Sequence, residues 1–524
     1  MLIQGLSLVL LFLGGQAAAA SSAGLFTRVV SNLTAVQTGS VPCNALVAAG
    51  LGGRLLYPTD SLYNERISSY WSVSAQLRPW CIFQPDSGEL CNHLASEIST
   101  ALTALNSAGD GAGDWHIAVR GGGHSSWPGI NNVDNGVTID LGNFNTSWYN
   151  ATTGLASVVP GEKWVDVAAD LIKDDVIVYG GRDGGVGVGG FLLGGGNNYN
   201  AQRYGFGCDN VVNYELVLAN GSIIDVNNQT HPDLFKALKG GSANFGIVTR
   251  YDMNAFPAQE IWGGSIISTK ETSEAVVAAT VNYAHLPQSV AIDDSAIIIY
   301  EHNATLAPTE DWIIISALTN VQGNANSSAF TEFRALNATT TSYALYNYVD
   351  YLEAGENAGD LRVTWFTQTF KADERVLTKA VELYNEYVTV LQDHMPADAF
   401  MARMIWQSMP TWAAYANSDN VLGLNEKLTD TSILWMIHCL VDTVEQEAIA
   451  NQYLAVMSAE LSAFAASLDA HIDWTYLNYA GPAQNPLGGY GQDNVDLIRS
   501  VAAAYDPEGF FQKRVPGGFK ISRV

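Results

Sequence analysis

The stretch that decides the fold is Arg120-Gly121-Gly122-Gly123-His124-Ser125, which follows a short apolar run at 117–120. An apolar run of this length that ends in glycine predicts a strand leading into a turn. Three consecutive glycines let backbone N–H groups approach a bulky anionic ligand, and such groups form a concavity that suits a pyrophosphate. An ordinary glycine turn with an incidental histidine is the alternative, so the motif alone leaves both interpretations open.

A second glycine-rich stretch runs from Gly180 to Asn198 and contains the spacing G-x-G-x-x-G at Gly185, Gly187 and Gly190. A Rossmann dinucleotide site needs a strand before this spacing, a long helix after it and an acidic residue on the second strand. Residues 191–196 read Phe-Leu-Leu-Gly-Gly-Gly, which is poor material for a stable helix, so we interpret the match as a false positive. What remains is a backbone without side chains that can lie against a large flat ligand.

Length, composition and charge restrict the possible partners. The chain has 524 residues, of which 48% are hydrophobic and 15% charged, so we expect a globular protein of two units. Its formal net charge of −27 argues against nucleic acid and against anionic membranes, since both attract basic proteins. No cysteine or histidine spacing typical of a zinc site occurs, so no metal is predicted. We expect a monomer that acts on a small-molecule substrate.

The first twenty residues predict a signal peptide. An apolar run from Leu6 to Leu13 precedes small residues that end at Ala20, although a basic start is missing. No other segment is long and apolar enough to predict a membrane span. Eight glycosylation sequons agree with export, and they begin at Asn32, Asn145, Asn150, Asn220, Asn228, Asn303, Asn326 and Asn337. We therefore expect a secreted, extracellular glycoprotein.

Five cysteines in an exported chain leave at least one thiol unpaired if every bridge is intramolecular. Cys43, Cys81 and Cys91 lie near each other in the sequence, and we expect one bridge among them without being able to choose the pair. Cys208 and Cys439 lie in or beside apolar runs, which predicts buried and unreactive thiols.

After the predicted signal peptide, the pattern of strand-like, helical and turn-rich segments changes twice along the chain. From 76 to about 257, short strand-like runs alternate with glycine-rich turns. From 258 to 470, strand-like runs alternate with longer helical stretches, which predicts a sheet with helices on one face. The segment 471–524 is again rich in turns. We interpret 258–470 as an insertion between two halves of one domain, formed by 21–257 and 471–524.

Taken together, the motifs of this chain resemble vanillyl-alcohol-oxidase-type, or PCMH-type, FAD-linked oxidases. The best resemblance is to the berberine-bridge-enzyme-like branch that includes fungal oligosaccharide oxidases. Besides the two glycine segments, the motifs that occur in the family's order are Val159-Pro160-Gly161, Asp209-Asn210-Val211-Val212, the run from Gly240 to Thr249, Asn478-Tyr479 and Tyr505-Asp506-Pro507.

The resemblance implies an α+β fold, in which a bipartite FAD-binding domain carries an inserted substrate domain of antiparallel sheet backed by helices. It also implies FAD bonded through its 8α-methyl group to His124. The FAD contacts expected from the matched motifs are Arg120, Gly121, Gly122, Gly123, His124, Ser125, Gly184, Gly185, Val186, Gly187, Val188, Gly189, Gly194, Asn197, Asn198, Ile247, Val248 and Asn478.

Two positions refine this expectation. Relatives with a second covalent bond carry a cysteine where this chain has Asp183, and a carboxylate cannot form that thioether, so we predict one bond and no cysteinyl link. The resemblance implies that a valine at the position of Val186 is the gate through which oxygen reaches the flavin, whereas relatives with isoleucine at this position are dehydrogenases. Valine is one methylene smaller, which favours an oxidase that uses O2.

Hydride transfer to a flavin needs a base for the proton that leaves the substrate. The resemblance places Tyr476 and Tyr479 near the substrate, and His438 on an apolar strand is a third catalytic candidate. Packing beneath the flavin is the alternative role for the tyrosines, and a hydrogen-bonded core position is the alternative for the histidine. Tyr199 and Gln368 are further candidates.

The sequence therefore predicts a secreted FAD-dependent oxidase that moves hydride from a C–OH or C–H substrate to flavin and then to O2, with H2O2 as product. Two alternatives stay open. The protein could be an enzyme that closes rings in a secondary metabolite or desaturates it, or a secreted FAD-binding glycoprotein without catalytic activity.

Overall fold

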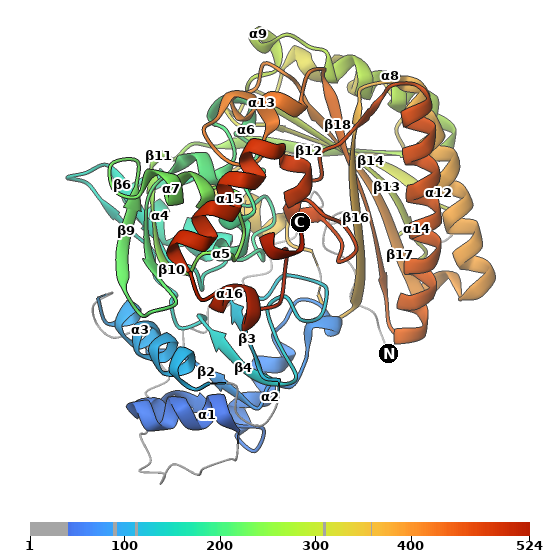
Figure 1. The fold of residues 1–524 in the computed structure, drawn as a ribbon. Helices are drawn as coiled ribbons and strands as arrows, with labels where there is room; N and C mark the ends of the chain where they lie inside the picture. The colour runs from blue at the N-terminus through green and yellow to red at the C-terminus, as the bar shows by residue number, and fades with distance from the viewer. Residues whose placement is uncertain (1–39, 87–91, 110–113, 308–310, 358) are drawn as a thin grey trace.

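A computed structural model describes residues 40–524 except 87–91, 110–113, 308–310 and 358 (Figure 1). The predicted signal peptide and Cys91 lie outside the described residues. Within them, the strands form one sheet of four, one of five, one of two and one of eight. Helices and sheets are mixed along the chain, so the predicted α+β class is confirmed.

The four-stranded sheet carries the first glycine segment at its edge. Its order is β1 (Leu55–Leu56), β2 (Cys81–Phe83), β4 (Gly136–Asp140) and β3 (His116–Arg120), and the last three strands are parallel. Helices α1 (Val41–Leu46) and α3 (Asn92–Ser107) pack near it. Since β3 ends at Arg120, the following glycines leave the sheet at the carboxyl edge of its parallel strands, where ligand sites commonly form.

The disulfide joins this sheet to the preceding helix. Cys43 in α1 is bonded to Cys81 in β2, which confirms that one bridge forms among the three nearby cysteines. Cys208 and Cys439 are free and buried, as predicted.

The five-stranded antiparallel sheet lies beside the second glycine segment. Its order is β5 (Trp148–Asn150), β6 (Leu155–Val158), β10 (Ile247–Asn254), β8 (Val211–Val217) and β9 (Ile223–Asn227). Inside the glycine segment the structure forms a short helix, α5 (Val188–Leu193), where the sequence predicted none. Val188 and Leu192 lie four residues apart and are both buried, so their packing offsets the poor helix propensity of the glycines. The preceding strand, β7 (Val176–Ile177), pairs antiparallel with β11 (Phe256–Pro257), which excludes a parallel Rossmann unit here.

The eight-stranded sheet forms the second unit, and each neighbouring pair of its strands is antiparallel. Its order is β15 (Thr340–Tyr346), β12 (Ile261–Thr269), β14 (Ile313–Asn320), β13 (Asp294–Asn303), β17 (Phe400–Met409), β18 (Ser432–Val441), β16 (Arg362–Lys371) and β19 (His471–Ile472). Helices α8 (Ser273–Ala284), α12 (Glu374–His394) and α14 (Val444–Ser467) cover one face, as Figure 1 shows. The predicted boundaries of the insertion, 258 and 470, stay predictions. Strand β19 pairs with β16, so the sheet itself extends two residues beyond 470.

The C-terminal segment packs back onto the first unit (Figure 1). Its helices are α15 (Gln492–Tyr505) and α16 (Phe510–Lys513), and Phe510 and Phe511 enter the core that surrounds the four-stranded sheet. None of the helices in the described part of the chain combines the length and apolar character needed to cross a membrane.

Candidate active site

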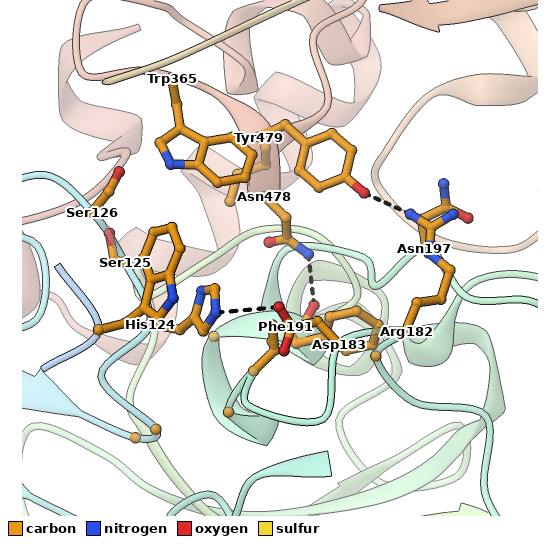
Figure 2. Close-up of a pocket in the computed structure, with 18 of the residues that line it drawn as sticks. His124, Ser125, Ser126, Arg182, Asp183, Phe191, Asn197, Trp365, Asn478 and Tyr479 are labelled. Carbon is orange, nitrogen blue, oxygen red and sulfur yellow. Dashed lines mark hydrogen bonds and ion pairs between the residues drawn. The ribbon is translucent and has the colours of Figure 1, made fainter. Parts of the chain in front are cut away.

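A cavity of about 450 Å³ lies where both glycine segments meet the uncovered face of the eight-stranded sheet (Figure 2). Most of the predicted site residues line it, namely Gly121, Gly122, Gly123, His124, Ser125, Val186, Gly187, Gly189, Asn197, Ile247, Val248, His438, Tyr476, Asn478 and Tyr479. The predicted contacts outside this lining are Arg120, Gly184, Gly185, Val188, Gly194 and Asn198.

Several of these outlying residues shape the loops that form the cavity wall. The Arg120 guanidinium donates to the backbone oxygens of Arg66 and Ser69 at 2.7 and 2.9 Å, so it ties the start of the first glycine segment to residues 66–69. A Cβ atom on Gly194 would lie 1.8 Å from the Asn478 side-chain oxygen, which explains why a glycine stands there.

The two glycine segments touch each other through their backbones. A Cβ atom on Gly122 would lie 2.4 Å from the Cα atom of Gly187, and one on Gly121 would lie 2.8 Å from the Pro160 oxygen. Because contacts this short exclude any side chain, the segments form a bare wall of backbone along the cavity. Such a wall suits a ligand that is both anionic and flat.

His124 lies on this wall in an unusual environment. Its ring stacks on Trp71 with a centroid distance of 4.4 Å and an interplanar angle of 11°. Its Nε2 atom lies 3.8 Å from an Asp183 oxygen, too far for a hydrogen bond, and has no hydrogen-bond partner among the described residues. Burial lowers the pKa of His124, although Asp183 opposes this effect, so the imidazole is held neutral and can act as a nucleophile.

Asp183 belongs to a chain of hydrogen bonds that starts in the eight-stranded sheet. The backbone and side-chain nitrogens of Asn357 donate to one Asp183 oxygen at 3.1 and 2.7 Å. Arg403 donates to the Asn357 side-chain oxygen at 2.8 Å and to Glu301 at 2.7 Å. The Trp71 indole also donates to the Asn357 backbone oxygen at 3.2 Å, so Asn357 holds both residues that flank His124.

Tyr479 is held at the opposite side of the cavity, where Figure 2 shows it near Arg182 and Asn197. The Arg182 guanidinium donates to the Tyr479 hydroxyl oxygen at 2.6 Å, and the Gln407 amide donates to it at 3.4 Å. These two donors fix the position of the oxygen and leave one of its hydrogen-bonding positions for a ligand. A cationic donor also stabilises negative charge on the oxygen.

Tyr476 has a different environment. Its hydroxyl oxygen accepts hydrogen bonds from the backbone nitrogens of Gly196 and Asn197 and from the Asn478 amide, at 3.1, 2.6 and 3.1 Å. Burial raises the pKa of Tyr476 well above its usual range. These bonds give Tyr476 a structural role, in which it holds the turn at the end of the second glycine segment.

The other candidates divide between the two faces of the sheet. The His438 side chain lines the cavity, its Nδ1 atom has no hydrogen-bond partner within the described chain, and burial holds its pKa well below the usual range. Tyr199 also lines the cavity. Gln368 does not line it, because its amide donates to the Ser458 oxygen on helix α14, on the opposite face of the sheet. The proposed catalytic role of Gln368 was therefore wrong.

Sequence reasoning missed Glu301, Asn357, Arg403 and Gln407. Arg403 and Gln407 alternate with buried apolar residues along β17, so a period of two could have placed them on the uncovered face. Asn357 lies in a loop without any local motif, and nothing in the sequence signals its position.

Fold and site together define a flavin-binding protein, and comparison with known proteins agrees. An FAD binding domain model matches residues 95–227, which include both glycine segments. A protein of Aspergillus calidoustus named FAD-dependent monooxygenase drtC is 34% identical over 503 residues, which cover 92% of this chain and 90% of that protein. The chain therefore belongs to the PCMH-type, vanillyl-alcohol-oxidase-like family of FAD-dependent oxidoreductases, and it is an FAD-linked enzyme.

Solved structures share the fold of this chain. The wild-type BBE-like 1 protein of Physcomitrella patens has a TM-score of 0.68 at 17% identity, with 89% of this chain and 97% of that chain covered. Glucooligosaccharide oxidase from Acremonium strictum has a TM-score of 0.68 at 18% identity, with 90% and 97% covered. The predicted FAD-binding fold is thereby confirmed.

The residues of the cavity fit FAD. The backbone wall can accept a pyrophosphate and a flat ring, and the imidazole of His124, which burial holds neutral, lies on the same wall.

Proposed function

We propose that this protein is a secreted oxidase, with FAD bonded to His124 alone, that converts an alcohol into a carbonyl compound and reduces O2 to H2O2. The observation that carries the proposal is the pairing of a neutral, half-buried His124 on one side of the cavity with an Arg182-bound Tyr479 on the other.

The residue at position 183 supports a single covalent bond. The glucooligosaccharide oxidase from Acremonium strictum is described as carrying a 6-S-cysteinyl, 8α-N1-histidyl FAD. This chain has Asp183 where a cysteinyl bond would start. The free cysteines within the described residues, Cys208 and Cys439, do not line the cavity, so neither can replace it.

FAD, when bound, accepts a hydride from the substrate carbon. The chain supplies the group that takes the hydroxyl proton, and Tyr479 is the residue best placed to do so. Arg182 and Gln407 hold its oxygen in place and stabilise negative charge on it. Overall, the alcohol loses two electrons and two protons, and O2 takes up both to become H2O2.

Access of oxygen rests on Val186. This side chain lines the cavity beside the first glycine segment, and it leaves more space than isoleucine would. A small side chain next to the flavin supports O2 as the electron acceptor.

Secretion is supported by several features. The Cys43–Cys81 disulfide is typical of an oxidising compartment. Six sequon asparagines are exposed, as glycosylation requires, namely Asn145, Asn150, Asn220, Asn228, Asn326 and Asn337. Asn303 is buried and Asn32 lies outside the described residues. Mass measurement of protein from the culture medium, before and after removal of N-glycans, tests this part of the proposal.

The decisive test of the reaction uses isotopically labelled O2. An oxidase places the label in H2O2, in an amount equal to the substrate consumed, and none in the organic product. Label in the product would instead establish a monooxygenase, the second candidate, which the name of the 34% identical fungal relative favours.

A further inference from the structure

We infer that the substrate is a largely apolar alcohol and not an oligosaccharide; this inference rests on the proposed alcohol oxidation. The feature that carries it is the wall of the cavity formed by the uncovered face of the eight-stranded sheet.

The middle of this wall is a stripe of aliphatic side chains. The strand registers place Ile315, Ile299, Ile405 and Met436 side by side across β14, β13, β17 and β18. All four are buried, all four line the cavity, and they form one apolar cluster. Such a surface gains free energy by covering apolar carbon and offers no partner to a hydroxyl group.

The polar side chains around the stripe are already paired with one another. Gln407 donates its amide hydrogen to Tyr479 and accepts from Asn197 at 3.0 Å. Arg403 is bound to Glu301 and Asn357. A sugar brings several hydroxyl groups, each of which would lose water here without finding a free partner on these residues.

The polar atoms that stay available point to a ligand with few hydrogen-bonding groups. The Tyr479 oxygen keeps one position at which it can meet one substrate hydroxyl group, whereas the unpartnered Nδ1 atom of His438 has almost no surface open to the cavity. Trp365 lies between them, with ring centroids 4.8 Å from His438 and 6.0 Å from Tyr479. An indole accepts a sugar or an apolar ring equally well, so the aliphatic stripe and the paired polar groups decide between them.

The first experiment measures binding to the flavin-loaded wild-type enzyme under anaerobic conditions, through changes in the flavin absorption spectrum. The probes are cinnamyl alcohol and perillyl alcohol on one side, and cellobiose and N,N′-diacetylchitobiose on the other. We expect a saturable spectral change with an apolar alcohol and none with the sugars at about 100-fold higher concentration. A saturable change with a sugar, or none with either apolar alcohol, would overturn the inference.

Variants locate the binding surface. Met436→Gln and Ile299→Asn place amide groups in the stripe, and we expect each to raise the Kd of the apolar alcohol by about tenfold or more without changing flavin content. Ile223→Asn, on the exposed strand β9, is the matched control and leaves the Kd unchanged. Met436→Gln nearly conserves side-chain shape, so it tests the inference even if Ile299→Asn does not fold. An unchanged Kd in Met436→Gln would contradict the inference.

The same readout separates this inference from the proposed function. Binding of an apolar alcohol, together with labelled oxygen in the organic product instead of in H2O2, would disprove the oxidase and leave the apolar binding surface standing. Rapid H2O2 formation with oligosaccharides alone would support the oxidase and overturn the inference of an apolar substrate.

Discussion

His124 is the residue on which the cofactor assignment depends. Its ring is half-buried, neutral and held between Trp71 and Asp183, which suits it to the proposed covalent bond. We expect wild-type protein to stay yellow after acid precipitation, and His124→Ala to release all flavin into the supernatant with the fold intact. His285→Ala, which changes an exposed histidine far from the glycine segments, should retain its yellow colour. A colourless wild-type pellet would refute the covalent bond.

Tyr479 and Tyr476 form a matched pair that separates chemistry from structure. Tyr479→Phe should slow flavin reduction by substrate about 100-fold or more, since it removes the proton acceptor, with flavin content unchanged. Tyr476→Phe should leave that step nearly unchanged and lower the free energy of unfolding by about 1–3 kcal/mol, because three buried donors lose their acceptor. Rapid-reaction spectroscopy and urea unfolding measure the two effects. Equal slowing in both variants would argue against a distinct role for Tyr479.

Val186 tests the route of oxygen. Val186→Ile adds one methylene to a packed wall, which should slow reoxidation of the photoreduced enzyme about tenfold or more while substrate binding changes little. The measurement is the reoxidation rate in air-saturated buffer, with the exposed Val456→Ile as control. If Val186→Ile reoxidises as fast as wild type, the gate lies elsewhere; slow reoxidation of the wild type itself would indicate a dehydrogenase.

At the scale of elements, the regular patterns were predicted well and the irregular ones were not. The apolar residues of 373–394 repeat with helical spacing, so the sequence predicts a helix over this range, and α12 begins and ends within one residue of it. Strand β12 was missed because Gly263 and Gly264 interrupt its apolar run, although both are buried against neighbouring strands. Strand β15 was missed because it lies at the sheet edge, where most of its side chains are exposed and no apolar alternation is needed.

The same difference separates the predicted from the missed site residues. His124, Asp183 and Tyr479 belong to motifs in which neighbouring residues identify them. Asn357 bonds to Asp183, and Arg403 and Glu301 are linked to Asp183 through Asn357. These contacts join segments that are far apart in sequence, so no local pattern predicts them. The cofactor-binding loops can therefore be predicted from a single sequence, because their motifs are local. The contacts that position those loops cannot, because they depend on the tertiary structure.

Asn357 gives a test of this coupling between the sheet and the FAD-binding loops. Asn357→Ala removes the side-chain donor to Asp183 and the acceptor for Arg403, so Asp183 and Trp71 should hold His124 less firmly. We expect a severalfold lower fraction of covalently bound flavin, measured by intact-protein mass, with total flavin binding reduced much less. Asn417→Ala, an exposed asparagine in the same unit, serves as control. An unchanged covalent fraction would show that the loop is fixed without Asn357.

The C-terminal segment follows the insertion in the sequence and completes the core of the first unit. Asn244 donates to the Phe519 oxygen at 3.0 Å, and the Nζ atom of Lys520 donates to the Ala243 oxygen at 2.6 Å. Ala243 and Phe519 both line the FAD cavity. The last residues of the chain are therefore part of the cofactor site, and the first unit cannot be complete without them.

Lys520 makes this closure sensitive to pH. Burial lowers the pKa of Lys520 from 10.5 to about 7 in the folded protein, with Arg523 contributing in the same direction and Asp506 opposing. Between these two values the unfolded chain binds the proton and the folded chain does not. Stability from this group therefore increases as pH rises from about 7 to about 10.5, with a slope of at most about 1.4 kcal/mol per pH unit.

Replacing the amine removes that slope. Lys520→Met keeps the length of the side chain without a titrating group, so it should unfold at higher urea concentration than wild type near pH 7.5, and the difference should shrink toward pH 10. The loss of the hydrogen bond to Ala243 reduces the gain but does not depend on pH. Lys513→Met, on the exposed side of the same segment, should parallel the wild type at every pH. Wild type and Lys520→Met share every other titrating group, so the diagnostic quantity is the difference in their free energies of unfolding. A difference that stays constant from pH 7 to 10 would show that Lys520 remains charged in the folded protein.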